Sequence, residues 1–221
     1  DEILGTLVEF DCEKTKSILG PKFEADPTDI ETANKIFKFM LQGKCTDDPL
    51  WLASGKIIFE QNPDFGLAKN IALKNKANDD IEGAEYYFAK AAELASDPED
   101  KADMHIQLGH IDREKGAKTA ARAHYRDAIS ASKSKDAYEF IGILYMTSFE
   151  DCAKKVNRVQ DRAVFLAAYK MFKLAGSTKR MAEAKAQFPS VGEIFELNMQ
   201  KGQAMTVGCW INESVTLETR D

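Results

Sequence analysis

Three histidines, His105, His110 and His124, are the side chains here that most readily bind metals or move protons near neutral pH. His105 and His110 stand five positions apart, which turns them about 140° around a helix, whereas helical metal-binding pairs stand four apart. We therefore expect these histidines to pack inside the fold or to line a groove. We predict no metal site and no bound cofactor.

Other patterns associated with catalysis are incomplete. Ser54-Gly55-Lys56 lacks the preceding glycine of a phosphate-binding loop, and the Gly-x-Ser-x-Gly nucleophile motif is absent. The acidic pairs Asp47-Asp48 and Asp79-Asp80 each precede an expected helix, where a carboxylate accepts hydrogen bonds from free backbone N–H groups. The sequence thus indicates a protein that is not an enzyme.

The four cysteines are Cys12, Cys45, Cys152 and Cys209, and the closest two are 33 positions apart. No C-x-x-C spacing occurs, so neither a thioredoxin-type motif nor tight zinc spacing is indicated. Among the three possible pairings we favour Cys12 with Cys45 and Cys152 with Cys209, each contributing about 4 kcal/mol on a loop-entropy model. The alternative is four buried thiols that pack as small apolar groups. Disulfides would indicate an oxidising compartment, periplasmic or otherwise extracytoplasmic, and free thiols a cytoplasmic one.

A repeated helical pattern positions these groups. The pattern Ala-x3-aromatic-x2-Ala occurs as Ala84-x3-Phe88-x2-Ala91, Ala121-x3-Tyr125-x2-Ala128 and Ala168-x3-Phe172-x2-Ala175. Each copy follows another expected helix, and one face of that helix carries a small residue: Ala72, Gly109 or Gly142. Small residues facing aromatic ones let two antiparallel helices approach closely. Such a pair cannot bury its apolar face alone, so neighbouring pairs stack.

This pattern resembles the tetratricopeptide repeat (TPR) family. Within that family's repeat of about 34 residues, the eighth position is a small residue, the twentieth and twenty-seventh are alanine and the twenty-fourth is aromatic, and these positions match the residues just quoted. The stretch Lys115–Ala121 also resembles the turn between the family's two helices. Two departures are the absence of tryptophan at position 4 and a spacing of 37 residues between the first two repeats instead of about 34. The resemblance implies an all-α fold, a right-handed α-solenoid of antiparallel helix pairs.

The expected organisation is a solenoid over residues 1–203 and an extended C-terminal tail over 204–221. The clearest repeats cover 65–98, 102–133 and 135–176, and the last contains an insertion at 147–160.

Further helices are expected on both sides of these repeats. They cover 1–19, 29–42, 49–60, 178–187 and 191–200. The tail alternates apolar and polar residues, and because it has no sheet to join we expect it to pack back along the helices. Because the sequence begins at Asp1 and not at Met, we expect a processed protein or an excised fragment.

The resemblance also implies a partner-binding groove lined by the first helix of each repeat. The candidate groove residues are Lys69, Leu73, Lys76, Ile106, His110, Arg113, Glu139 and Ile143. The groove would change from basic in the first repeat to acidic in the third above an apolar floor, which suits a peptide or a partner helix. The alternative is that these charges form a solvated face. Trp51 and Trp210 are either buried or anchors for a partner.

Composition limits the remaining function classes. The 221 residues carry 30 Lys and Arg against 36 Asp and Glu, a net charge of −6, which argues against binding to nucleic acid. No apolar stretch is long enough for a membrane span. The insertion cysteine and the ending Gly208-Cys209-Trp210-Ile211-Asn212-Glu213 together resemble TPR-like proteins of bacterial envelopes.

We therefore expect a non-catalytic scaffold or adaptor that binds a protein partner in a bacterial envelope assembly. The first alternative is a periplasmic holdase or assembly chaperone for secreted or outer-membrane clients. The second is an accessory domain of a larger enzyme.

Overall fold

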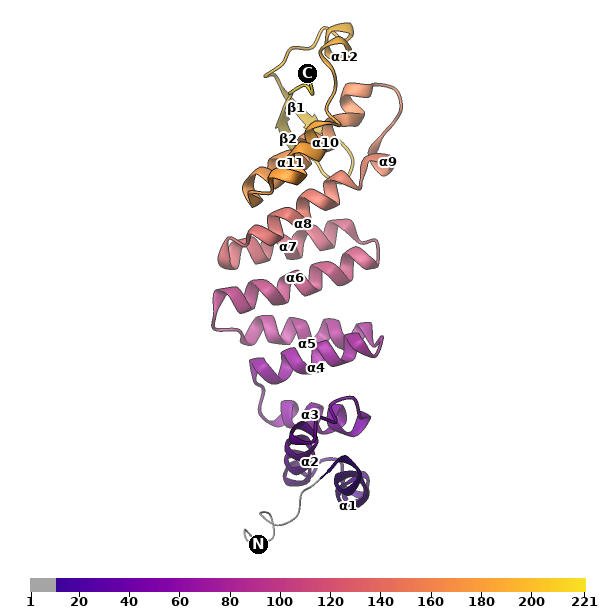
Figure 1. Cartoon of the computed structure of the whole chain (residues 1–221), viewed down its shortest axis with the longest axis vertical. Coiled ribbons are helices and arrows are strands. Elements are labelled where there is room, and N and C mark those ends of the chain that lie inside the picture. Colours follow the sequence, from indigo (N-terminus) through magenta and orange to yellow (C-terminus); the bar gives the residue numbers. More distant parts are fainter. Residues whose placement is uncertain (1–10) are drawn as a thin grey trace. The chain divides into compact units, whose positions relative to one another are not determined.

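Figure 1 shows the computed structural model of the chain, which describes residues 11–221. The chain divides into two compact units, Asp1–Ala95 and Ser96–Asp221. In the described residues the fold is built almost entirely from helices, and successive helices pack as antiparallel pairs. The predicted fold class, an α-solenoid of TPR-like helix pairs, is confirmed.

The first unit contains five described helices. They are α1 (Cys12–Ala25), α2 (Ile30–Gln42), α3 (Pro49–Gln61), α4 (Phe65–Ala77) and α5 (Ile81–Leu94). Helices α2 and α3 form one pair and α4 and α5 another, while α1 packs on α2. The core between α1, α2 and α3 is made by six buried side chains: Leu19, Phe23, Ala33, Ile36, Met40 and Trp51.

Aspartates begin the helices of this unit, as the acidic pairs predict. Asp48 accepts a hydrogen bond from the backbone N–H of Leu50 at the start of α3, and Asp80 accepts one from Gly83 in α5, both at 2.9 Å. A carboxylate there satisfies a free N–H and meets the positive end of the helix dipole.

The first helix, α1, has different bounds from the helix predicted over residues 1–19. Its first ten predicted residues lie outside the described part of the chain, and α1 continues past Leu19 to Ala25 with Pro21 inside it. Leu19 and Phe23 stand one helical turn apart and are both buried in the core. Their shared burial explains why the helix extends beyond the predicted end.

The second unit contains seven helices and a small sheet. The helices are α6 (Pro98–Glu114), α7 (Lys118–Ser132), α8 (Lys135–Met146), α9 (Phe149–Cys152), α10 (Arg158–Ala175), α11 (Thr178–Lys185) and α12 (Val191–Glu196). Helices α6 and α7 form a pair, and α8 pairs with α10 across the predicted insertion, which contains α9. Helix α10 is the centre of this unit, because α8, α11 and the sheet all pack on it.

The small–aromatic contacts predicted from the repeat are present in the second unit. A Cβ atom on Gly142 would lie 2.5 Å from Cε1 of Phe172, and one on Gly109 would overlap the ring of Tyr125. Both rings are fully buried. Glycine is therefore required here for the close approach of α6 to α7 and of α8 to α10.

The tail folds differently from the prediction. Strands β1 (Ala204–Val207) and β2 (Glu213–Thr216) pair with each other in an antiparallel hairpin, with Ala204 opposite Thr216. The expectation that the tail has no strand to pair with is wrong, since the chain reverses between them with positive φ angles at Cys209 and Asn212. The expected packing along the helices is present, because both strands contact α10.

Side chains of α7 and α8 hold the turn of this hairpin. The Arg122 guanidinium donates hydrogen bonds to the carbonyl oxygens of Trp210 (3.2 Å) and Ile211 (2.6 Å) and stacks over the Trp210 ring. Glu213 pairs with Arg126 at 2.8 Å and accepts a hydrogen bond from the Tyr145 hydroxyl. Trp210 is thus half-buried and engaged within its own unit.

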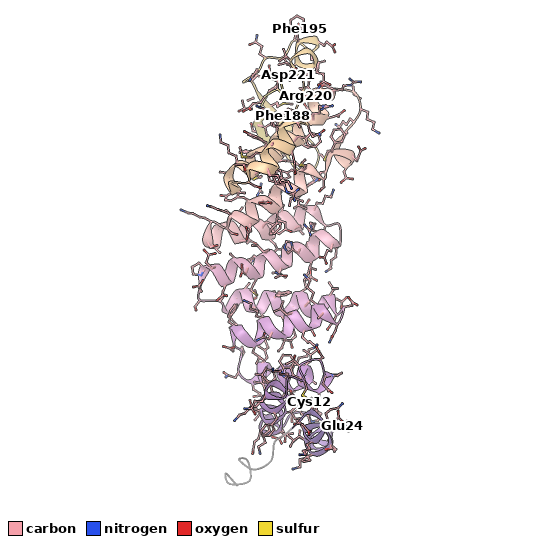
Figure 2. All side chains as sticks on the ribbon, in the orientation of Figure 1. Cys12, Glu24, Phe188, Phe195, Arg220 and Asp221 are labelled. Carbon is pink, nitrogen blue, oxygen red and sulfur yellow. A yellow bond between two sulfur atoms is a disulfide. The ribbon has the colours of Figure 1, made fainter. Side chains whose placement is uncertain are left out.

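The end of the chain is also anchored within the second unit (Figure 2). Arg220 donates to the carbonyl oxygen of Phe188 at 3.0 Å, and Asp221 accepts a hydrogen bond from the backbone N–H of Val191 at 3.0 Å. These contacts connect the last residues to the segment between α11 and α12.

Two disulfides cross-link the chain, and they join the pairs favoured from the sequence. Cys12 at the start of α1 is bonded to Cys45 in the loop after α2, with Cα atoms 6.0 Å apart. Cys152 in α9 is bonded to Cys209 in the hairpin turn, with Cα atoms 5.4 Å apart. Each bond lies inside one unit and fixes an irregular segment to a helix. Within residues 11–221, no helix is both long and apolar enough to cross a bilayer.

Candidate functional site

A depression of about 380 Å³ opens beside α2, α3 and α4 in the first unit. It is lined by Phe37, Leu41, Thr46, Asp47, Trp51, Asn70, Leu73, Lys74 and Ala77. Two of these residues are leucines that stay in contact with water: Leu41 is 54% exposed and Leu73 is 44% exposed. Exposed apolar side chains around a hollow offer area that a partner can remove from water.

Aromatic side chains make part of the wall of this depression rigid. The rings of Phe37 and Trp51 stack with centroids 4.9 Å apart, and Trp51 is only 5% exposed. Its indole Nε1 is buried without a hydrogen-bond partner among the described residues. Trp51 is therefore a core residue whose packing holds the wall in place, and of its two predicted roles the structure shows burial.

The loop between α2 and α3 forms the polar rim. Asp47 pairs with Lys74 of α4 at 2.5 Å, and Asp48 pairs with Lys16 of α1 at 2.9 Å. The disulfide of Cys45 attaches the same loop to α1. Three separate contacts therefore fix this rim before any partner arrives, which lowers the ordering cost of binding.

The first three predicted groove residues follow one face of α4. Lys69, Leu73 and Lys76 stand four and three positions apart, which places them on neighbouring turns of the same side. Leu73 lines the depression, and the two lysines are its neighbours on the same face of α4. The Lys69 ammonium lies over the Phe65 ring at 5.5 Å. The face around the depression is consequently apolar with a basic border.

The other predicted groove residues lie in the second unit and are mostly engaged there. Ile106 is 7% exposed and belongs to the core, so it does not form an open apolar floor. His110 hydrogen-bonds through Nδ1 to the Tyr125 hydroxyl at 2.9 Å, and its ring packs edge-on against Phe140. Arg113 is exposed.

The two predicted groove residues on α8 also contact other side chains of the second unit. Glu139 lies 3.6 Å from the Arg180 guanidinium on α11, and Ile143 is half-buried against the core of the second unit. The eight predicted groove residues are thus divided, with three on α4 in the first unit and five on α6 and α8 in the second. Of these eight residues, Leu73 lines the depression beside α4.

The structure also brings together three residues that the sequence does not connect. His105 of α6 faces His124 of α7 with ring centroids 5.9 Å apart, and Asp127 lies beside them. Burial lowers the pKa of His105, and the nearby Asp127 carboxylate opposes part of that change. The one sequence signal for this group is His124-x-x-Asp127, three apart on one helix face.

The helix pairs and their glycine–aromatic contacts are those of a TPR-like fold. No protein-family model matches the chain, and no curated protein matches its sequence.

Solved structures that it resembles include the crystal structure of MamA, with 20% identity, a TM-score of 0.49 and coverage of 82% of this chain and 100% of that one. Another is PilW, a widely conserved type IV pilus biogenesis factor, with 16% identity, a TM-score of 0.39 and coverage of 85% and 92%. A third is a monomeric mutant of IFIT1 with Gppp-AAAA, with 16% identity, a TM-score of 0.41 and coverage of 84% and 43%. Neither a partner nor a compartment follows from similarities this low.

Proposed function

We propose that this protein is a non-catalytic scaffold that holds a segment of another protein, and that the depression beside α4 takes an apolar side chain of that partner. The observation that carries the proposal is the pair of exposed leucines, Leu41 and Leu73, around a hollow whose wall and rim are already fixed. Burying one leucine-sized side chain contributes about 1.5–3 kcal/mol, so an anchor in this depression supplies part of the binding free energy and contacts around it supply the rest.

The charged side chains near the depression indicate which charges a partner would carry. Lys69 and Lys76 border Leu73 along α4, while Asp47 is paired with Lys74. A segment that places an acidic side chain about one helical turn from an apolar anchor complements this face. We therefore expect a short amphipathic helix or an extended peptide that carries both an apolar anchor and charged side chains.

The two disulfides support an extracytoplasmic location, such as the periplasm, and a role in a bacterial envelope assembly fits that location. The test is to block free thiols while the protein is recovered from the cells that naturally make it, and then to count them after denaturation. Absence of free thiols is expected. Four free thiols would place the protein in a reducing compartment.

A holdase for many unfolded clients is the second candidate. It is favoured by large apolar side chains that are exposed in the second unit, notably Phe195 at 79% and Val156 at 89%. A holdase would suppress the aggregation of unrelated unfolded proteins, and Phe195→Ser and Val156→Ser together would weaken that effect. A scaffold would leave such aggregation unchanged.

Site-specific photo-cross-linking tests the scaffold proposal. A benzophenone amino acid at Leu73 is compared with one at Leu174, which is a similarly exposed leucine (50%) on α10 in the second unit. In the native cells we expect a discrete cross-linked partner from position 73 and none from position 174. Identical products from both positions, or none from position 73, would contradict the proposal.

A further inference from the structure

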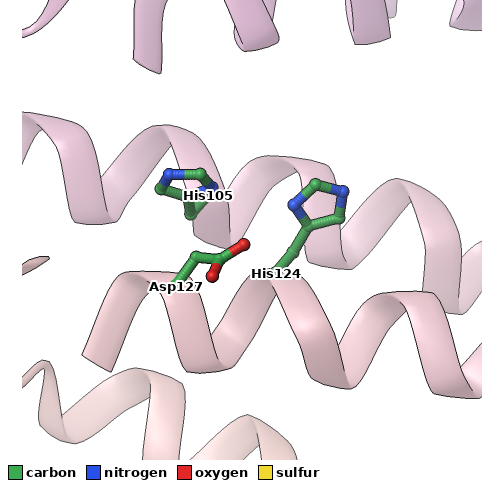
Figure 3. A group of neighbouring side chains, drawn as sticks. All are labelled: His105, His124 and Asp127. Atoms are coloured by element: carbon green, nitrogen blue, oxygen red, sulfur yellow. The ribbon is translucent and has the colours of Figure 1, made fainter. Parts of the chain in front are cut away.

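Helices α6 and α7 bring three metal-ligating side chains to one place in the second unit (Figure 3). His105 comes from α6, and His124 and Asp127 come from α7. One potential ligand atom from each residue lies within 4.8 Å of the other two. In Figure 3 the Asp127 carboxylate lies between the two imidazole rings.

The fold holds the two helices at the separation that this cluster needs. Gly109 stands one turn after His105, and the ring of Tyr125, the residue after His124, occupies the place where a Cβ of Gly109 would be. This close contact sets the distance between α6 and α7 next to the cluster. His124 and Asp127 are three apart on α7, so they project from the same face.

The hydrogen-bonding state of the histidines leaves nitrogen atoms available. Nδ1 of His105 and Nδ1 of His124 are both buried and have no hydrogen-bond partner among the described residues. Buried polar atoms are nearly always satisfied in native proteins, and an unsatisfied one indicates a bound ion or water. Two such atoms in adjacent rings beside a carboxylate favour a cation.

A second carboxylate orients one of the rings. Oδ2 of Asp112, which is itself buried, lies 3.6 Å from Nε2 of His124. Metal-binding histidines usually direct their second nitrogen at a carboxylate, which fixes the ring and leaves the other nitrogen's lone pair for the metal. Asp112 is in the position for that role, with Nδ1 of His124 as the ligand atom.

We propose that His105, His124 and Asp127 bind a divalent transition-metal ion, with Zn²⁺ the ion that two imidazoles and a carboxylate suit best. Around tetrahedral zinc, with bonds of about 2.0–2.1 Å, neighbouring ligand atoms are roughly 3.4 Å apart. The three ligand atoms, which lie within 4.8 Å of one another, would have to move closer to reach that spacing, and Asp127, which is exposed, has room to move. Three protein ligands leave a fourth position for water, and the ion would join α6 to α7.

Isothermal titration of the full chain with ZnCl2, after treatment with a chelator, tests the proposal. We expect one ion per chain with a micromolar or lower Kd. His124→Ala and His105→Ala should each weaken binding at least tenfold, and Asp112→Asn about tenfold, as is typical for residues that orient a ligand. The control is His110→Asn, which removes the third histidine, outside the cluster, and keeps a side chain that can hydrogen-bond to the Tyr125 hydroxyl. Circular dichroism checks that each variant is folded.

A measurement on the unaltered protein keeps the test valid if a variant does not fold. The absorption spectrum of Co²⁺ in place of Zn²⁺ should show the intense visible bands of a four-coordinate site, and the NMR signals of the His105 and His124 ring nitrogens should shift on adding Zn²⁺. Equal zinc binding by the parent and by His105→Ala/His124→Ala, or ring signals that do not move, would overturn the proposal.

Discussion

Gly109 and Gly142 face the buried rings of Tyr125 and Phe172, and neither position has space for a methyl group. In an ordinary helix, replacing glycine by alanine gains up to about 1 kcal/mol of helix propensity. At these two positions the added Cβ would displace a buried ring, and overpacking of this kind costs about 1–3 kcal/mol. The steric cost therefore exceeds the propensity gain.

We predict that Gly109→Ala and Gly142→Ala each lower the free energy of unfolding of the second unit by up to about 2 kcal/mol. Gly192→Ala is the control, since its Cβ would come no closer than 3.8 Å to another residue, and it should be neutral or slightly stabilising. Urea unfolding followed by circular dichroism measures all three. Stabilisation by either of the first two changes would show that the helices separate without cost.

Glu193 forms a capping box with Ser190 at the start of α12. The backbone N–H of Ser190 donates to its carboxylate at 2.7 Å, and with Arg162 and Arg220 it holds the pKa of Glu193 below its usual range near 4.5. A carboxyl group with a lowered pKa in the folded state contributes stability above its unfolded pKa. That contribution is lost as pH falls through the folded value.

We therefore predict that Glu193→Gln lowers the free energy of unfolding by about 1 kcal/mol at pH 6.5, the usual contribution of a helix-capping interaction. The difference between the parent and the variant should shrink as pH is lowered below 4.5, because the parent's carboxylate becomes protonated there. Urea unfolding at pH 6.5 and at pH 3 measures the difference. A difference that does not change with pH would contradict this account of Glu193.

At the scale of elements, the C-terminal hairpin depends on contacts from three other segments. Arg122 of α7 binds the carbonyl oxygens of its turn, and Glu213 is held by Arg126 and Tyr145. The Cys152–Cys209 bond attaches the same turn to α9. A two-stranded hairpin alone is marginally stable at best in water, so these anchors explain why it forms.

Cys152→Ser/Cys209→Ser should lower the free energy of unfolding of the second unit by about 2–4 kcal/mol, because the bond closes a long loop. Hydrogen exchange at Ala204–Val207 should also become faster, while exchange in α2 and α3 of the first unit should not change. Exchange in the hairpin as slow as in the parent would show that Arg122 and Glu213 hold it without the disulfide.

The elements also show which parts of the fold the sequence determines. The helices expected over 29–42 and 49–60 match α2 and α3 to within one residue at each end, since regular apolar spacing is combined there with aspartate caps and proline. The hairpin was not predicted, because the reversal between its strands uses a positive φ angle at Cys209, a residue type that rarely adopts one, as well as at Asn212.

The candidate sites were predictable only in part, for a related reason. Spacing places Leu73 on the exposed face of α4, but it does not separate Ile106, which is buried, from an exposed groove position on α6. The cluster of His105, His124 and Asp127 depends on the register between two antiparallel helices. Spacing along one helix carries no information about that register.

At the scale of the whole molecule, the chain consists of two compact units, and the second contains a complete core of its own. The buried cluster that surrounds α10 draws all its members from Ala102 to Leu217. We predict that residues 96–221 produced alone remain helical and unfold cooperatively on heating, as measured by circular dichroism. A fragment without a cooperative transition would show that this core needs the first unit.

The central claim is that the depression beside α4 binds a partner through an apolar anchor, and the most direct measurement is an affinity comparison. Peptides selected from a random library on the immobilised protein are labelled, and their Kd values are measured for the parent, Leu73→Glu and Leu174→Glu. Since burial of a leucine side chain contributes about 1.5–3 kcal/mol and about 1.4 kcal/mol corresponds to tenfold, Leu73→Glu should weaken binding at least tenfold. Leu174→Glu, the same change on another surface, should stay within about twofold of the parent. Equal affinities for the two variants would contradict the account.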